Sequence, residues 1–470
     1  MKILKPLTIL LGAAIAFIML SACSSDDNNL TADPFVVAFE TLSENLANID
    51  GSQTVNLIYS TNAKSNGSFS IAIVAENALY GTDFTTEPPA IDGKISLNIN
   101  SGSSANSFVF NKLNPNLDET TQITFTIGAI DYPNSEIRGN KTFVLNSEAS
   151  LGGSLAPEIG GPNEQYQVYV DLSGKNSKKI QRDAWDLAFY SYDGFRVGIN
   201  GAIYMAAAEL NETNIDDISE TDVADLMPQV AVGTFDPANE AYIDYPDGDI
   251  NRTAISEINL EDAANKVFLV NLGYEIGTET PTNGSVAVAG DARGWKKIRI
   301  LRSDDNYVLQ YANLNDNNHR EITINKTLGY NATFFSFNTN SVVNVEPEAD
   351  SWDLNFTVFT NLIEDNGSYG FVDGVLHNRK GGVTAYSVTT DQYAYEDFNT
   401  SNVIANNFKI DQRTIGASWR DVMNDQKVLI DTIFYIIKDS NGNVYKLKFT
   451  ALLNDNGERG YPEFKYELIQ

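Results

Sequence analysis

The stretch EPEADSWDLNF, from Glu346 to Phe356, contains a phrase that the chain uses twice. The earlier copy lies in QRDAWDLAF, from Gln181 to Phe189. Only four tryptophans occur among the 470 residues, and these two phrases take two of them. Because a tryptophan at the start of a strand is a large apolar anchor, the repeated Trp-Asp-Leu indicates that one β-structured pattern occurs twice.

The residues around the two phrases extend the repeat. A strand pattern precedes each phrase, YQVYVDLSG at 166–174 and YNATFFSFNTNSVVNV at 330–345. A hairpin pattern follows each, at 296–317 and 433–456, and both hairpins run into Leu-Asn-Asp-Asn. In the second hairpin, Asn441-Gly442 supplies the positive φ angles of a tight type I′ turn.

These matches divide the later part of the chain into two unequal antiparallel β modules, 165–322 and 323–470. Inside the phrase, alternation along a strand predicts that tryptophan and leucine share one face and aspartate lies on the other. We therefore expect Trp185 and Trp352 to pack in a core. We expect Asp186 and Asp353 to cap a nearby backbone amide.

The earlier part of the chain also reads as β-structure. Short alternating segments with Asn, Asp and Gly turns fill residues 33–146 and predict a separate β-sandwich. Residues 147–164, rich in Gly, Pro and Ser, predict a linker. Short helical turns are expected within 212–227. The predicted fold class is all-β, an N-terminal sandwich followed by the two modules.

The first residues resemble a bacterial lipoprotein signal. Residues 1–22 form a basic start and an apolar run ending in Leu-Ser-Ala before Cys23, the single cysteine of the chain. The resemblance implies that Cys23 is acylated and that 23–32 is a polar tether whose acidic residues resemble the surface-export signal of Bacteroidetes lipoproteins. We expect an outer-membrane protein, anchored by lipid and facing the cell exterior. The alternative is an ordinary signal peptide with a chance cysteine.

Composition excludes several classes of function. The net charge of −30 disfavours nucleic acid as a partner, because phosphate contacts require basic patches. One cysteine leaves no disulfide and no thiol nucleophile beyond the anchor. With only His319 and His377, a Ser-His-Asp triad or a histidine-rich zinc site has few residues to draw on. The chain is therefore predicted not to be an enzyme, although acids for a carboxylate pair are plentiful.

Two pairs of acidic residues are calcium candidates. YGTDFTT at 80–86 and the strand pattern after it resemble Calx-beta or related immunoglobulin-like modules, which implies calcium ligation by Asp83 and Glu119. Asp247 and Asp249 are spaced two apart, as acids in calcium loops are. The favoured alternative for all four is an ordinary turn acid.

The second copy carries the most specific resemblance. Residues 330–356, followed by FYIIKDSNGNVYKLKF at 434–449, resemble the HmuY family of haem-binding surface lipoproteins from Bacteroidetes, and the first copy resembles a diverged version of the same module. The resemblance implies haem as cofactor, captured outside the cell and delivered to an outer-membrane haem receptor. The membrane is then contacted only through the lipid anchor.

The resemblance also implies where the iron ligands lie. The local match places them at Asp391 and Asn424, which are not histidines. Their neighbours Tyr393 and Met423 are chemically better donors, because phenolate and thioether both ligate haem iron. His377, before a glycine pair, is the outside candidate. The alternatives are a core-filling methionine, one tyrosine among 22, and an ordinary histidine.

The missing histidines support a second function. In this alternative, the chain is a surface-anchored module that keeps the fold, has lost haem ligation, and binds a glycan or a protein. Fold alone does not decide between the two.

Overall fold

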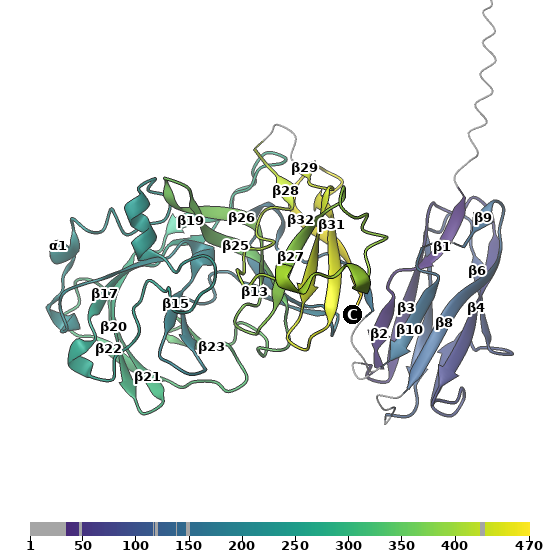
Figure 1. Cartoon of the computed structure of the whole chain (residues 1–470), viewed down its shortest axis with the longest axis horizontal. Helices are drawn as coiled ribbons and strands as arrows, with labels where there is room; N and C mark the ends of the chain where they lie inside the picture. Colours follow the sequence, from purple (N-terminus) through teal and green to yellow (C-terminus); the bar gives the residue numbers. More distant parts are fainter. Residues whose placement is uncertain are drawn as a thin grey trace, which may run out of the picture.

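The computed structural model describes residues 34–46, 49–115, 117, 121–137, 139–146, 151–423 and 428–470. Cys23 and Glu119 lie outside these residues. The described chain is almost entirely β, which confirms the predicted fold class, and none of its helices has the length and apolarity needed to cross a bilayer. Figure 1 shows a separate N-terminal sandwich beside a larger body.

The N-terminal sandwich consists of two five-stranded sheets with the orders β5-β7-β3-β1-β9 and β2-β10-β8-β4-β6. Alternate residues of β3, β6 and β8 point inward, as in QITFTIGAID of β8, and contribute to one aromatic-rich core. The strands are β1 (Phe35–Phe39), β2 (Ser43–Asn45), β3 (Ser52–Tyr59), β4 (Gly67–Glu76), β5 (Phe84–Glu87), β6 (Lys94–Ile99), β7 (Ala105–Lys112), β8 (Gln122–Asp131), β9 (Ser135–Glu136) and β10 (Thr142–Asn146).

The predicted linker is wrong over part of its length. Residues Gly152–Leu155 form β11, an edge strand that pairs with the last strand of the chain, β32 (Arg459–Leu468). The segment also contacts the sandwich, because the Leu151 amide donates to Ser43 Oγ at 2.6 Å. Glu44 of the sandwich forms an ion pair with Lys175 of the larger body at 3.3 Å.

Four main sheets build the larger body. Their orders are β13-β12-β25-β26, β15-β14-β23-β24, β16-β17-β20-β21-β22 and β11-β32-β31-β30-β27. The strands are β12 (Tyr166–Asp171), β13 (Asn176–Gln181), β14 (Leu187–Tyr190), β15 (Val197–Ile199), β16 (Ala206–Glu209), β17 (Val267–Asn271), β20 (Trp295–Ser303), β21 (Asn306–Ala312), β22 (Arg320–Ile324), β23 (Ala332–Ser336), β24 (Ser341–Val343), β25 (Leu354–Ile363), β26 (Gly367–His377), β27 (Thr384–Thr389), β30 (Ile433–Lys438) and β31 (Val444–Leu453).

The larger body also contains two hairpins of short strands and several short helical elements. Two hairpins pair β18 with β19 and β28 with β29, and the helical elements are all short, including the predicted turns within 212–227. These elements are β18 (Tyr274–Ile276), β19 (Ala289–Ala292), β28 (Arg420–Asp421), β29 (Val428–Leu429), α1 (Glu220–Val223), and the 3₁₀ turns η2 (Gly161–Asn163), η3 (Gly201–Ile203), η4 (Ile215–Asp217), η5 (Pro237–Tyr242), η6 (Asp262–Ala264), η7 (Thr400–Asn402) and η8 (Ala405–Asn407).

The two sequence copies exchange strands. β12 of the first copy pairs with β25 of the second, and β23 of the second pairs with β14 of the first. The registers match, since Tyr169 lies opposite Asn355 and Phe334 lies opposite Ala188. The copies are thus related by an approximate two-fold axis and do not form two separate modules divided at residue 322.

The aspartate of each Trp-Asp-Leu phrase accepts a backbone amide from the residue that follows the strand paired with it from the other half. Asp353 Oδ2 accepts the Leu172 amide at 2.8 Å, and Asp186 Oδ2 accepts the Phe337 amide at 2.6 Å. The predicted capping role is therefore confirmed, and burial raises the pKa of both carboxyls. Arg293 also contacts Asp186, at 2.6 Å.

The prediction that tryptophan and leucine share a face is wrong. β14 and β25 begin at the leucine, so each tryptophan precedes its strand and is free of the alternation. Leu187 and Leu354 enter two different cores, whereas Trp185 and Trp352 meet in a third cluster.

The exchange produces two lobes, each with its own core (Figure 1). In one lobe the sheet containing β14 and β23 packs on the β16–β22 sheet, and in the other the sheet containing β12 and β25 packs on the β27–β32 sheet. In the sheet that starts at β16, hairpin β20–β21 forms the third and fourth strands, and in the sheet that starts at β27 these positions belong to β31–β32. The sequence pattern matched β20–β21 with β30–β31, so the predicted match of the two hairpins is wrong by one strand.

The exchange predicts that neither half folds as a monomer. Residues 323–470 alone leave β25 without β12 and β23 without β14, so we expect no cooperative thermal transition from a monomeric fragment. Residues 151–322 and 323–470 produced together should purify as one complex. Residues 34–146, which own a complete core, are the control and should unfold cooperatively by circular dichroism. A folded monomer of 323–470 would contradict the exchange.

Candidate functional site

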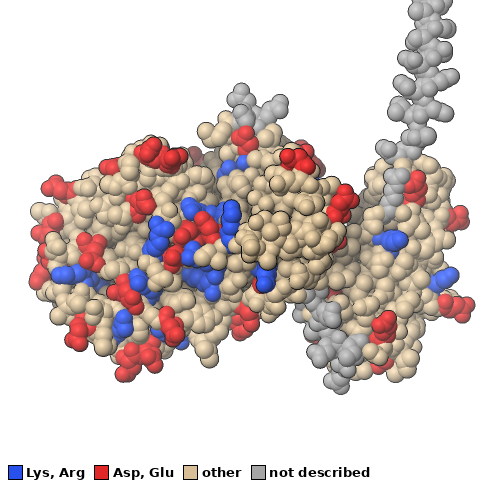
Figure 2. Space-filling model, viewed as in Figure 1, with Lys and Arg blue, Asp and Glu red and all other residues tan. Residues whose placement is uncertain are grey.

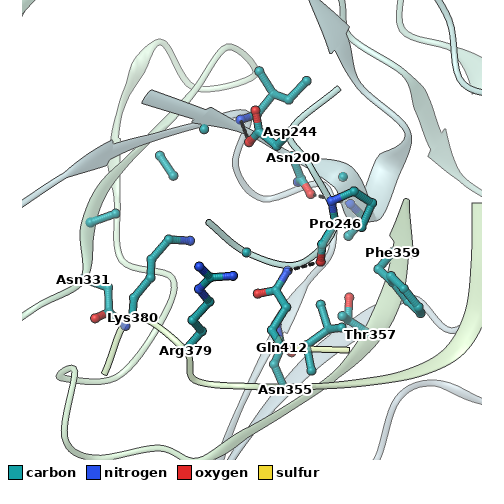
Figure 3. A pocket seen from close by; sticks show the side chains of 18 of the residues that line it. Asn200, Asp244, Pro246, Asn331, Asn355, Thr357, Phe359, Arg379, Lys380 and Gln412 are labelled. Atoms are coloured by element: carbon teal, nitrogen blue, oxygen red, sulfur yellow. Dashed lines mark hydrogen bonds between the residues drawn. The ribbon is translucent and has the colours of Figure 1, made fainter. Parts of the chain in front are cut away.

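A cavity of about 200 Å³ lies where the two lobes meet, and both halves of the chain line it. Figure 3 shows Arg379, Lys380 and Gln412 reaching into it from one wall, with Asp244 and Asn200 on the opposite wall. We call this space the central pocket.

Two asparagines hold the tryptophans against the pocket. Asn200 follows β15 and its amide donates to the Trp185 carbonyl at 2.8 Å. Asn378 follows β26 and donates to the Trp352 carbonyl at 3.0 Å. The asparagines therefore occupy equivalent places in the two halves, and each fixes the entry of a Trp-Asp-Leu strand.

The aromatic wall of the pocket repeats the exchange. Trp185 meets Phe334 edge to face, with ring centroids 4.9 Å apart, and Tyr169 meets Trp352 at 5.0 Å. Such geometry is the favoured one for aromatic pairs. Each pair joins one residue of the first half to one of the second, so the wall exists only when both halves are folded together.

Two carboxyl groups lie in the walls of the pocket. Asp244 accepts the amides of Ile199 and Ala254 at 2.8 and 2.9 Å, and burial raises its pKa to about 6. Glu346 accepts the Ala332 amide at 3.2 Å, and burial raises its pKa to about 7. Lys380 lowers the pKa of both carboxyls but does not offset their burial.

The rim of the pocket carries paired charges. Arg379 contacts Asp247 and Asp249, each at 3.3 Å, and Arg252 contacts Asp247 at 3.5 Å. Figure 2 shows basic and acidic side chains gathered together near the middle of the molecule. Lys380 is exposed, and no ion pair involves it among the described residues.

The calcium candidates have other partners in the structure. Asp247 and Asp249 neutralise arginines, and Asp83 accepts the Leu79 amide and the Asn114 side chain in its turn. Across the described ranges, no group of three or more His, Cys, Asp or Glu side chains converges in the way a metal ion requires. The favoured interpretation of these three acids as turn residues accounts for their contacts.

His377 ends β26 inside the pocket, 1% exposed. Burial lowers its pKa to about 4, so the imidazole is neutral at physiological pH. The Ile410 carbonyl approaches the ring, yet neither nitrogen reaches hydrogen-bonding geometry with a described atom. Pockets that bury drug-sized ligands measure roughly 300–1,000 Å³, so the cavity beside His377 is too small for a porphyrin, and the structure argues against His377 as a haem ligand.

The other two haem candidates lie elsewhere, at one end of the β27–β32 sheet. β27 ends beside the start of β30, where the Thr390 amide donates to the Thr432 carbonyl at 2.9 Å. This contact joins the loop carrying Tyr393 to the segment that follows the Met423 hairpin. Met423 is 92% exposed and is therefore not a core filler.

Tyr393 is 41% exposed, and its ring packs against Phe398 with centroids 5.6 Å apart. Of the two positions matched directly to the family's ligands, Asp391 is exposed and Asn424 lies outside the described residues. The structure thus links the Tyr393 loop to the segment after the Met423 hairpin and leaves both donor side chains open to solvent.

Comparison with known proteins decides the family. The family model described as HmuY protein matches residues 163–321 and 330–466, together more than half of the chain. The chain belongs to the HmuY family. The two matched regions follow the two halves of the HmuY body, and the family is associated with haem binding. No curated protein matches the chain.

Solved structures show weak similarity to this HmuY-family chain. An apo HmuY analog from Tannerella forsythia is 11% identical, with 68% of this chain and 96% of that chain covered and a TM-score of 0.18. Apo PinO from Porphyromonas gingivitis is 9% identical over 68% and 97%, with a TM-score of 0.18. The Calx CBD1 domain is 13% identical over 24% and 97%, with a TM-score of 0.20. Such scores carry no argument about function.

Sequence reasoning missed most of the central pocket. It singled out His377, Trp185 and Trp352 but gave none of them this place, and it did not identify Asn355, Glu346 or Lys380 as site residues. The repeated Trp-Asp-Leu was the available signal, because the strand that begins at its leucine lines the pocket in both halves.

The raised pKa of Glu346 predicts a pH-dependent stability. The folded pKa of about 7 exceeds the ordinary 4.5, so the stabilisation present below pH 4.5 is lost as pH rises to about 7. In Glu346→Gln the side chain stays neutral at every pH. The free energy of unfolding of the variant minus that of the wild type should therefore increase by about 3 kcal/mol between about pH 4 and about pH 8. Lys380, Lys178 and Tyr169 also face this carboxyl.

Chemical denaturation of both proteins across this pH range measures the difference. The exposed Glu348→Gln, two residues away, is the matched control and should follow the wild type. Parallel pH profiles for Glu346→Gln and the wild type would contradict the buried, raised carboxyl.

Proposed function

We propose that this protein captures haem at the bacterial cell surface and passes it to an outer-membrane receptor. Membership of the HmuY family supports a role connected with haem. The observation that carries the proposal is the contact of Thr390 with Thr432, which joins the Tyr393 loop to the segment after the Met423 hairpin at one end of a sheet. A thioether and a phenol are both ligands of haem iron, and their exposure leaves them accessible to a flat ligand.

Haemin titration tests this proposal. Residues 24–470 should give a saturable shift of the Soret band, and Met423→Ala should weaken haemin binding about tenfold or more, corresponding to about 1.4 kcal/mol. Leu328→Ala removes an equally exposed apolar side chain, 93% against 92%, and should leave the titration unchanged. Tyr393→Phe separates ligation by the phenol from packing of the ring. A Soret band unchanged by the protein, with iron oxidised or reduced, would remove haem from its function.

The same proposal places the protein on the outer membrane through a lipid on Cys23. Wild-type protein expressed in a bacterium with lipoprotein processing should enter the detergent phase on phase separation, and Cys23→Ser should remain in the aqueous phase. Surface exposure is measured by protease digestion of intact cells. Equal partition of the two proteins would contradict the anchor.

A second function is favoured by a different observation. The central pocket is built by both halves, and its volume of about 200 Å³ does not suit a porphyrin. Binding of a glycan or a protein at the cell surface is therefore the alternative function of this chain.

A further inference from the structure

The central pocket concentrates buried polar atoms that have no partner in the protein. Ten such side-chain atoms occur in the described part of the chain, and five of them belong to residues that line this pocket. An unpaired buried polar group costs about 1–3 kcal/mol. The five are Asn331 Oδ1, Trp352 Nε1, Asn355 Oδ1, His377 Nδ1 and His377 Nε2.

The fold does not require these polar groups, because the other half of the chain manages without them. Asn355 lies opposite Tyr169 where the first half has Ala188 opposite Phe334. His377 lies opposite Leu354 where the first half has Ile199 opposite Leu187. The polar residues therefore stand at scaffold positions that an alanine and an isoleucine fill equally well.

The unpaired tryptophan arises from the same asymmetry. Trp185 Nε1 donates to Gln167 Oε1 at 2.9 Å, but the position equivalent to Gln167 is Ala332, which offers Trp352 no acceptor. One half of the pocket is thus satisfied within the protein. The other half leaves donors and acceptors unpaired in residues that line the cavity.

The kinds of atom indicate the ligand's chemistry. Asn331 and Asn355 present carbonyl acceptors, Trp352 presents an N–H donor, and the neutral His377 ring has one nitrogen of each kind. A ligand that satisfies them must both donate and accept at several points. Hydroxyl groups do both, whereas carboxylates and phosphates only accept.

Charge and size narrow the class further. Lys380 faces Glu346 and Asp244, and Arg379 is already paired with two aspartates, so the pocket holds no surplus positive charge for an anion. The cavity of about 200 Å³ is smaller than the roughly 300–1,000 Å³ of pockets that bury drug-sized ligands, so it suits a small ligand such as a single sugar residue. The aromatic pairs beside it provide apolar contact.

The pocket is open to solvent at its rim. Lys380 is exposed, and Gln412 and Asp249 are half-buried. From this geometry we propose that the central pocket binds one neutral sugar residue, held by hydroxyl hydrogen bonds to Asn331, Trp352, Asn355 and His377. The site is distinct from the Tyr393 and Met423 loops and does not depend on haem binding.

Tryptophan fluorescence of residues 24–470 tests the proposal, since two of the four tryptophans line the pocket. The probes are D-glucose, D-galactose, D-mannose, L-fucose and N-acetyl-D-glucosamine, with D-glucuronate and acetate as anions. At least one neutral sugar should give a saturable change in the millimolar range or below. Its methyl glycoside and a disaccharide ending in it distinguish a free sugar from a glycan terminus.

Two variants copy the other half of the chain and are therefore compatible with the fold. Asn355→Ala and His377→Ile should each weaken sugar binding at least about fivefold, the range expected when one buried hydrogen bond is lost. Both should also raise the melting temperature without sugar, because an unpaired polar group is removed. Gln412→Ala, at the half-buried rim, provides a milder third variant, and Met423→Ala should leave sugar binding unchanged.

Several results would overturn the proposal. These are the absence of a saturable response to every neutral sugar up to decimolar concentration, a response to glucuronate or acetate only, and unchanged sugar affinity in Asn355→Ala and His377→Ile. Because haemin binding is measured separately through the Soret band, a failure here leaves the haem proposal standing, and the reverse also holds.

Discussion

Each Trp-Asp-Leu strand depends on a strand from the other half of the chain. The pairing of β12 with β25 and of β14 with β23 creates both lobes at once, because each core contains residues of both halves. The aspartates complete this arrangement by accepting the amides of Leu172 and Phe337 just beyond the exchanged strands. The central pocket follows from it, since its aromatic wall consists of contacts between the halves.

The sequence predicted features that are local. Alternation identified the N-terminal sandwich, and the repeated phrase identified the duplication and the capping by Asp186 and Asp353. It did not predict the exchange, because the pattern within a strand is the same whichever strand pairs with it. It also missed β11, whose Gly-Gly-Ser-Leu has no alternation and reads as a linker. Pairing with β32 makes it a strand.

The site was harder to predict than the fold, for a related reason. His377 was singled out for iron chemistry, but its place opposite Leu354 buries it in a pocket too small for a porphyrin. Asn355 gave no signal, since a single polar residue in a strand pattern is common on a solvent face, and Glu346 lies between two strands, where acidic residues are common. Only the three-dimensional register shows that Asn355 faces the junction of two lobes and not water.

The reciprocal pairing has the form of a homodimer whose subunits have been joined end to end. In such a dimer the pocket would sit on the symmetry axis, and any substitution would change both walls together. Fusion into one polypeptide releases that restriction: Gln167 can remain a partner for one indole while Ala332 leaves the other unoccupied. A ligand that lacks two-fold symmetry then becomes recognisable, which two identical subunits meeting on an axis cannot achieve as readily.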